Sequence, residues 1–210
     1  MNRLLAFSFA LCLFASSFAL LGQSRRSVVE GAPRDLVWWE DLDEAVAAQA
    51  TGTVVLALDA TKKKWRELPL MLLELPDLRY LLLNRNKLET LPDWLADMKD
   101  LRVVVADYNR METFPRVLLD MPNLTQISLG ENYIEAIPLD IDQMTGLEYL
   151  ALWGNVVGMY PASLSDLPNL KALDLLHNEM SEREQELLRE WLPKVQLNMS
   201  EPCQCDFDNP

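Results

Sequence analysis

The chain contains few of the residues that catalytic and metal sites most often use. Its 210 residues include one histidine, His177, and three cysteines. A centre that needs two imidazoles, such as a zinc site with several histidine ligands, is therefore excluded. Only 7 glycines are present, and no phosphate-binding glycine loop or nucleophile elbow is found among them. The composition predicts a protein with no enzymatic activity, no cofactor and no metal.

Basic residues are also scarce. The sequence has 19 Lys and Arg against 32 Asp and Glu, a formal net charge of -13. Proteins that bind nucleic acid neutralise phosphates with clustered Lys and Arg, so nucleic acid is a poor candidate partner. Hydrophobic residues make up 50% of the chain, which is enough to form a core and argues against disorder of the whole chain.

The first segment has the composition of a secretory signal peptide. A basic start at Arg3 is followed by an apolar stretch and then by small residues, and this order predicts a signal peptide over residues 1–19, cleaved after Ala19. Alternative cleavage sites extend the boundary to about residue 24. An uncleaved anchor is the less favoured alternative, because the apolar run has only just the length of a membrane span. We expect a secreted, periplasmic or cell-envelope protein with no membrane span after cleavage.

Export would change the expected redox state of the two cysteines outside the signal peptide. Cys203 and Cys205 are separated by one residue, and an oxidising compartment would allow them to form a disulfide. A loop this tight strains a disulfide, so free thiols or a bridge to another chain stay open as alternatives. With His177 they make three soft ligands, one short of a closed zinc site.

A repeat of 23 residues organises most of the chain. Six rows can be written from Val55 to Leu170, and their fourth and sixth columns are apolar throughout. Two apolar positions of this spacing predict a short strand with one buried face, and stacked units join these faces into one core. The ninth column holds an asparagine in five rows, whose amide can satisfy backbone groups at the turn: Asn86, Asn109, Asn132, Asn155 and Asn178.

The rows resemble the leucine-rich repeat family. Residues 78–88 match its pattern of leucines at the first, fourth, sixth and eleventh positions and asparagine at the ninth. The resemblance covers about residues 53 to 192 and implies an α/β solenoid. Its curved parallel sheet would line the concave side, with short helical or irregular convex limbs. The first row departs from the pattern, with Lys63 in place of asparagine, as end repeats often do.

Both ends of the solenoid require caps, because a bare apolar edge would otherwise be exposed. A linker and a capping helix over residues 40–50 are expected within residues 20–52, with Trp38 and Trp39 sealing the first edge. About six repeats occupy residues 53–180. A helix that begins with a capping box at Ser181, followed by a last strand, forms the C-terminal cap over residues 181–200. Residues 201–210 are a tail.

Function is expected on the concave sheet, where strand residues point away from the core. Aromatic residues and arginine are enriched at protein-binding hot spots, and many of them share this face. The predicted partner-binding residues are Arg79, Tyr80, Arg85, Arg102, Val103, Val105, Tyr108, Tyr149, Trp153, Leu176 and His177.

The sequence therefore predicts a noncatalytic module that binds a protein or peptide on its concave sheet. One alternative is binding of cell-surface or matrix carbohydrate, for which the tyrosines and Trp153 would be stacking platforms. Another is a structural envelope protein that self-associates. The sequence does not define the oligomeric state.

Overall fold

The structure, a computed structural model, describes Val29 and residues 32–202. The chain divides after Gly31 into two units, and the description below concerns the second one. The predicted signal peptide and the two cysteines at 203 and 205 lie outside the described residues. None of the helices in the described ranges has the length and apolarity needed to cross a bilayer.

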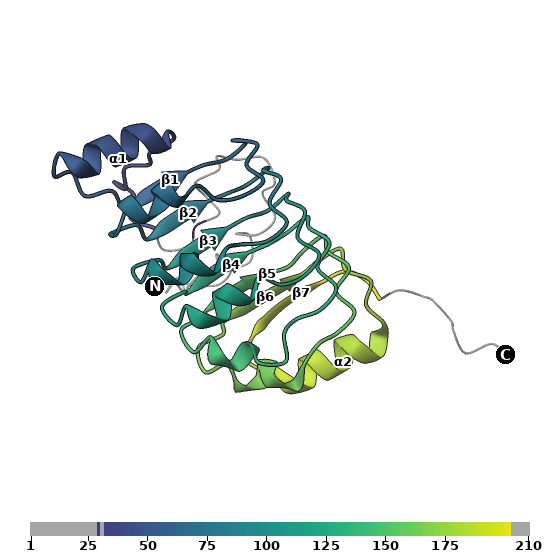
Figure 1. Ribbon diagram of the computed structural model, residues 1–210. Helices are drawn as coiled ribbons and strands as arrows, with labels where there is room; N and C mark the ends of the chain where they lie inside the picture. Colours follow the sequence, from purple (N-terminus) through teal and green to yellow (C-terminus); the bar gives the residue numbers. More distant parts are fainter. Residues whose placement is uncertain (1–28, 30–31, 203–210) are drawn as a thin grey trace, which may run out of the picture. The chain divides into compact units, whose positions relative to one another are not determined.

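Seven short strands form one parallel sheet in chain order, as Figure 1 shows. They are β1 (Ala57–Asp59), β2 (Tyr80–Leu82), β3 (Val103–Val105), β4 (Gln126–Ser128), β5 (Tyr149–Ala151), β6 (Ala172–Leu175) and β7 (Gln196–Met199). Neighbouring strands of the six repeats pair with a constant offset of 23 residues, for example Leu81 with Val104 and Val104 with Ile127. This register is the repeat length of the sequence, so the predicted parallel solenoid sheet is confirmed.

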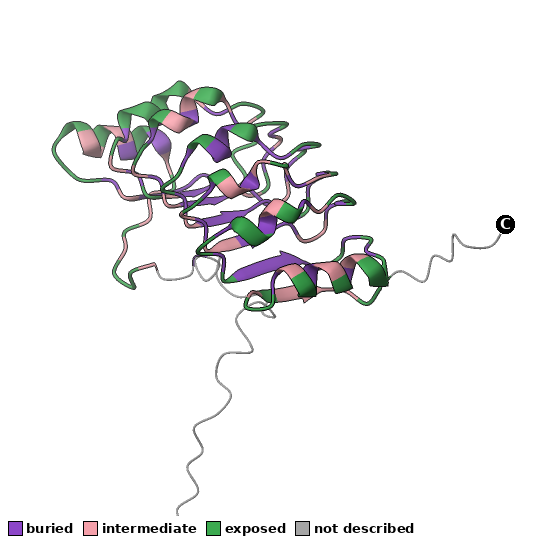
Figure 2. Ribbon diagram, turned by 90° about the horizontal axis from the view of Figure 1, so that it is seen from below, coloured by how far each residue is buried: buried purple, intermediate pink, exposed green. Residues whose placement is uncertain are grey.

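A row of 3₁₀ helices alternates with the strands along the unit. They are η2 (Leu70–Glu74), η3 (Asp93–Asp97), η4 (Arg116–Asp120), η5 (Ile141–Gln143) and η6 (Ala162–Asp166). Four of them directly follow a proline, whose fixed φ and missing N–H suit a helix start. Each buries an apolar side chain such as Leu72 or Leu95 under the sheet. In Figure 2 the strands are largely buried while the helices carry exposed residues on their outer side.

The C-terminal cap consists of helix α2 (Glu182–Trp191) and strand β7. The Ser181 hydroxyl accepts a hydrogen bond from the Glu184 N–H, and the Glu184 carboxylate accepts one from the Ser181 N–H, which completes the predicted capping box. Strand β7 pairs with β6 over four residues. The last repeat is therefore covered by further sheet.

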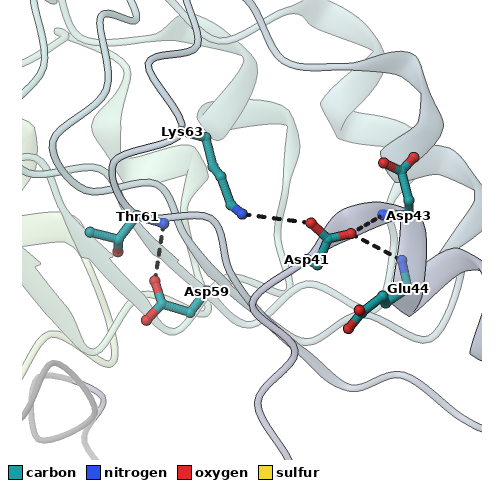
Figure 3. Close-up of polar contacts among 6 residues, drawn as sticks. All are labelled: Asp41, Asp43, Glu44, Asp59, Thr61 and Lys63. Atoms are coloured by element: carbon teal, nitrogen blue, oxygen red, sulfur yellow. Dashed lines mark hydrogen bonds and ion pairs between the residues drawn. The ribbon is translucent and has the colours of Figure 1, made fainter.

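The N-terminal cap is built differently. Helix α1 (Leu42–Ala50) packs beside η2 and begins after Asp41, whose carboxylate accepts hydrogen bonds from the Asp43 and Glu44 N–H groups. It therefore starts two residues later than the sequence analysis expected, because Asp41 is the N-cap. The outer edge of β1 pairs with the backbone of Trp39, whose N–H donates to the Ala57 carbonyl over 3.1 Å. Figure 3 shows Asp41 also facing Lys63, with an N–O distance of 3.9 Å.

Candidate functional site

Alternation along each strand separates two faces of the sheet. The central residues, such as Leu81 and Val104, are fully buried in the apolar core. The residues on either side of them, such as Tyr80 and Leu82, point away from that core. We call this second side the outward sheet face; it is the side that the sequence analysis expects to be concave.

Accessibility varies strongly across the outward sheet face. Val103 and Val105 are 2% and 0% exposed, and parallel register sets Val105 beside the fully buried Leu82. The two valines thus offer almost no area to a partner in this structure. The predicted binding residues with partly exposed side chains are Tyr80, Arg102, Tyr108, Tyr149, Trp153 and Leu176.

Three of the predicted residues form a continuous row where the strands end. The Arg85 guanidinium lies 4.5 Å from the centre of the Tyr108 ring. Tyr108 in turn meets Trp153 edge to face, with ring centroids 5.5 Å apart and an interplanar angle of 75°. Such pairs add roughly 0.5–1.5 kcal/mol beyond the area they bury. We call Arg85, Tyr108 and Trp153 the aromatic row; it connects the second, third and fifth repeats.

Gly130 lets the indole of Trp153 lie directly against the backbone of the fourth repeat. A Cβ atom on Gly130 would stand 2.2 Å from Cε2 and 2.3 Å from Nε1 of Trp153. No side chain fits in that space unless the indole moves. The position of Trp153 within the aromatic row therefore requires a glycine at position 130.

The other predicted residues lie around this row. Tyr80 is 6.1 Å from Trp38 between ring centroids, and the Lys171 ammonium lies 5.8 Å from the Tyr149 ring. Lys171 also pairs with Glu148 at 2.6 Å. The remaining arginines and the histidine lie at the two ends of the strands: Arg79 and Arg102 precede β2 and β3, and His177 follows β6.

The five asparagines of the ninth column are buried and bond in the same way from repeat to repeat. The Asn132 side chain accepts a hydrogen bond from the Met111 N–H and donates to the Ala106 and Leu129 carbonyls. Asn155 makes the equivalent bonds one repeat later, to the Ile134 N–H and the Leu129 and Leu152 carbonyls. Each amide thus satisfies buried backbone groups of two repeats at once. We call this set the asparagine ladder.

The residue before each ladder asparagine has left-handed backbone geometry. Its φ is 57° at Arg85, 58° at Tyr108, 50° at Glu131 and 58° at His177. This conformation costs a non-glycine residue about 1–2 kcal/mol. It is held because the N–H of Arg85, Tyr108 and Glu131 donates to a carbonyl of the next repeat, for example Tyr108 to Gly130 at 2.8 Å. The His177 N–H donates to the Ser200 hydroxyl at 2.7 Å. The side chains of this column therefore project from fixed positions.

Asp107, the residue before Tyr108, is a buried carboxylate with 6% exposure. It accepts hydrogen bonds from the Ser128 hydroxyl at 2.6 Å and the Gly130 N–H at 2.8 Å. The pKa of Asp107 is raised to about 6, mainly by burial and less by the charges of Asp174 and Glu131, against the lowering effect of these two hydrogen bonds. Burial also raises the pKa of Asp174.

Polar side chains at the strand ends satisfy N–H groups that the sheet does not pair. Asp59 and Asp174 each accept a hydrogen bond from the N–H two residues further on. Asn84 in the second repeat accepts one from the Asp107 N–H in the third repeat. These roles were not predicted, because the columns that hold these side chains carry other residue types in most repeats and leave no periodic signal.

No cluster of three or more potential metal ligands occurs within residues 32–202. Cys203 and Cys205 lie outside the described residues, so their pairing stays a prediction.

The comparisons with known proteins agree with this geometry. The family model described as Leucine Rich Repeat matches residues 77–98. A leucine-rich repeat protein of Leptospira interrogans is 30% identical, with a TM-score of 0.59 over 69% of this chain and 36% of that one. TLR13 in its complex with ssRNA13 is 27% identical, with a TM-score of 0.61 over 70% of this chain and 21% of that one.

Internalin C2 of Listeria monocytogenes is 20% identical, with a TM-score of 0.58 over 70% of this chain and 62% of that one, and it supports the fold alone. This chain therefore spans less than two thirds of each of these structures. A search of proteins with curated functions gives no match, and no catalytic family is found. Together with the register of the sheet, these findings show that the chain is a leucine-rich repeat protein.

Proposed function

We propose that this protein is a noncatalytic module that binds a protein or peptide on its outward sheet face, with the aromatic row at the centre of the contact. The observation that supports this proposal is the row itself: Arg85 and Trp153 each contact Tyr108, and all three side chains are at least partly exposed. Tryptophan, tyrosine and arginine are the residue types most enriched at binding hot spots.

The rigidity of the row supports this proposal. Tyr108 projects from a left-handed backbone position, and the missing side chain of Gly130 lets the indole of Trp153 lie against the backbone. Side chains that are fixed before binding lose little conformational freedom when a partner docks. A surface kept only for solubility would have no need for such fixed aromatic groups.

The proposal is tested by affinity capture from native envelope and culture-medium extract. The parent protein is compared with a Tyr108→Ala, Trp153→Ala double variant and with Tyr133→Ala. Tyr133 is 59% exposed and lies outside the row, so it controls for the loss of a surface aromatic group. Circular dichroism establishes that each variant is folded.

We expect one protein to be recovered with the parent and with Tyr133→Ala, and lost with the double variant. Equal recovery with all three would remove the aromatic row from the binding surface. Binding to a glycan array that depends on Tyr108 and Trp153 would favour the carbohydrate alternative. A shift in mass between reducing and nonreducing sizing runs would favour self-association.

We also propose that the protein works outside the cytoplasm, as a secreted, periplasmic or envelope protein. The basic and apolar pattern of residues 1–19 supports this. Intact mass measurement of the natural product should give a chain that begins near Leu20. A chain that retains Met1 would contradict cleavage and favour the uncleaved anchor.

A further inference from the structure

The loops that follow the strands form one continuous edge of the sheet. Parallel strands in chain order bring their carboxyl ends together, and backbone bonds extend this register into the loops. The Lys62 N–H donates to the Asn84 carbonyl over 2.9 Å, and the Arg85 N–H donates to the Asp107 carbonyl over 2.9 Å. We call residues 61–67, 84–90, 107–113, 130–136, 153–159 and 176–182 the loop edge.

Charge changes sign along the loop edge. In the first two repeats it carries two acidic side chains, Glu67 and Glu89, and six basic ones: Lys62, Lys63, Lys64, Arg66, Arg85 and Lys87. In the remaining four repeats it carries two groups that can be positive, Arg110 and His177, and five exposed acidic side chains: Glu112, Glu131, Glu135, Glu179 and Glu182. A sixth carboxylate, Asp107, is buried. A basic end of this size is unexpected in a chain with a net charge of -13.

The basic end is accessible to a partner. Lys62, Lys63, Lys64, Arg66 and Arg85 are all exposed. Lys63 has a long ion pair with Asp41, at 3.9 Å (Figure 3), and an exposed pair of this kind contributes little to stability. The three consecutive lysines include two left-handed residues, Lys62 and Lys64, with φ of 62° and 64°. Such a turn places like charges close together, which is unfavourable for folding and favourable for binding an anionic group.

We propose that the loop edge orients an oppositely polarised protein partner. An acidic segment of the partner would lie against the first two repeats, and basic side chains would lie against the third to sixth repeats. This inference rests on the proposed function and specifies its partner: a polypeptide surface with separated negative and positive segments. Complementary charges of this kind set the orientation and the rate of association more than the affinity.

The aromatic row supports this arrangement because it lies where the sign changes. Arg85 belongs to the basic end, Tyr108 is in the third repeat, and Trp153 lies against Gly130, the residue before Glu131. An apolar or aromatic anchor of the partner would therefore fall between its two charged segments. The anchor would supply affinity, and the two segments would fix its direction along the edge.

A polyanion such as heparin or single-stranded RNA fits the loop edge less well. Two repeats at about 4.8 Å spacing give a favourable length of roughly 10 Å, which is about three nucleotides at 3.4 Å each. Any longer polyanion would meet the carboxylates of the third and fourth repeats. Phosphates or sulfates over those repeats would lie within about one Debye length of the carboxylates, about 8 Å at physiological salt, so the repulsion would be only partly screened.

The orientation can be measured with synthetic peptides of known polarity. The probe is a peptide with four glutamates, a short linker containing one tryptophan, and four lysines, carrying a nitroxide at either the Glu end or the Lys end. It is titrated into the ¹⁵N-labelled full chain, and paramagnetic broadening of the amide signals is recorded. We expect the Glu-end label to broaden residues 61–67 and 84–90, and the Lys-end label to broaden residues 130–136 and 176–182.

Broadening of the same loops by both labels would overturn the inference. So would tighter binding of a heparin dodecasaccharide or an uridine dodecanucleotide than of the peptide, because either result would define a general polyanion site.

A charge-reversal pair gives the second arm of the test. Lys62→Glu, Lys64→Glu should weaken binding of the peptide about tenfold or more, since it reverses the local potential. The matched control is Lys99→Glu, Lys194→Glu, which makes the same change in net charge at two exposed lysines outside the loop edge. The control should weaken binding less than about twofold. Equal weakening by both pairs would show that net charge alone matters and would contradict the inference.

The result is separable from the test of the proposed function. Oriented peptide binding without capture of any natural protein would leave the polarity of the loop edge standing and refute the proposed function. Capture that depends on Tyr108 and Trp153 but not on Lys62 and Lys64 would support the proposed function and overturn the inference.

Discussion

Two sets of side chains run next to each other at the carboxyl ends of the strands and behave in opposite ways. The asparagine ladder is buried and repeats the same bonds through the second to sixth repeats. The adjoining column reads Arg85, Tyr108, Glu131, Gly154 and His177, with a common backbone conformation and no common chemistry. A column repeats where the backbone demands one particular group, and it varies where the side chain leaves the fold. The varying column is therefore the place to look for function.

The largest effect should follow from breaking the ladder in its middle. Asn132→Ala leaves the Met111 N–H without its acceptor and removes one of the two asparagine donors to each of the Ala106 and Leu129 carbonyls. An unpaired buried group costs about 1–3 kcal/mol, so the free energy of unfolding should fall by up to about 3 kcal/mol. Urea denaturation followed by circular dichroism measures this. A loss below about 0.5 kcal/mol would show that the ladder does not stabilise the stack.

The second largest effect is expected on the pH dependence of stability, through the buried carboxylate Asp107. The folded pKa of Asp107 is about 6 and its ordinary value is 3.8, so the folded state binds more protons between these values. The free energy of unfolding should therefore decrease as pH rises from about 4 to about 6, by up to about 3 kcal/mol for this group.

Asp107→Asn should remove this part of the pH dependence and stabilise the protein above pH 6. The gain should stay below about 3 kcal/mol, because the new amide N–H₂ needs acceptors. Denaturation of parent and variant at pH 4.5 and pH 7.5 provides the check. Parallel stability profiles for the two proteins would contradict the raised pKa.

A third variant tests how the aromatic row is held. Gly130→Ala places a methyl group where the indole of Trp153 lies, so the ring must move and the contact with Tyr108 should be lost. Overpacking costs about 1–3 kcal/mol, and we expect the lower end because Trp153 is partly exposed and can swing outward. Near-ultraviolet circular dichroism of the Tyr108–Trp153 pair reports the change. An unchanged spectrum would mean that the ring does not depend on the glycine.

The smallest effect is expected at the first repeat, where Lys63 stands in the asparagine column. A ladder asparagine bonds to the preceding repeat, and the segment before β1 supplies only the paired backbone of Trp39. Lys63→Asn should therefore change stability by less than about 0.5 kcal/mol, with a small loss from the exposed pair with Asp41. Thermal denaturation decides this, and a gain above about 1 kcal/mol would show that the ladder extends into the first repeat.

The sequence predicted the repeating part of the fold because periodic columns identify positions with the same environment. The strands, the asparagine column, the short helical limbs and the closing helix and strand all follow from such patterns or from a local capping motif. The start of α1 was misplaced because Glu40 and Asp41 both suit a helix beginning, and only the hydrogen bonds of Asp41 distinguish them.

The candidate site was less predictable, because alternation tells which face a strand residue points to and not how far it is covered. Val103 and Val105 illustrate this: their direction follows from the sequence, and their burial does not. The close approach of the Trp153 indole to Gly130 and the hydrogen bonds of Asp107 join residues of neighbouring repeats, and within the described residues each occurs in one place. Features that occur once leave no periodic trace in the sequence.

In the proposed function the aromatic row, with Tyr108 in its middle, contacts a protein partner. The most direct test places a photo-crosslinking phenylalanine derivative at position 108 and, as a control, at position 133, followed by irradiation in native extract and mass spectrometry. We expect one covalent adduct with a defined protein at position 108 and none at position 133. The same adducts at both positions, or an adduct at position 133 alone, would contradict it.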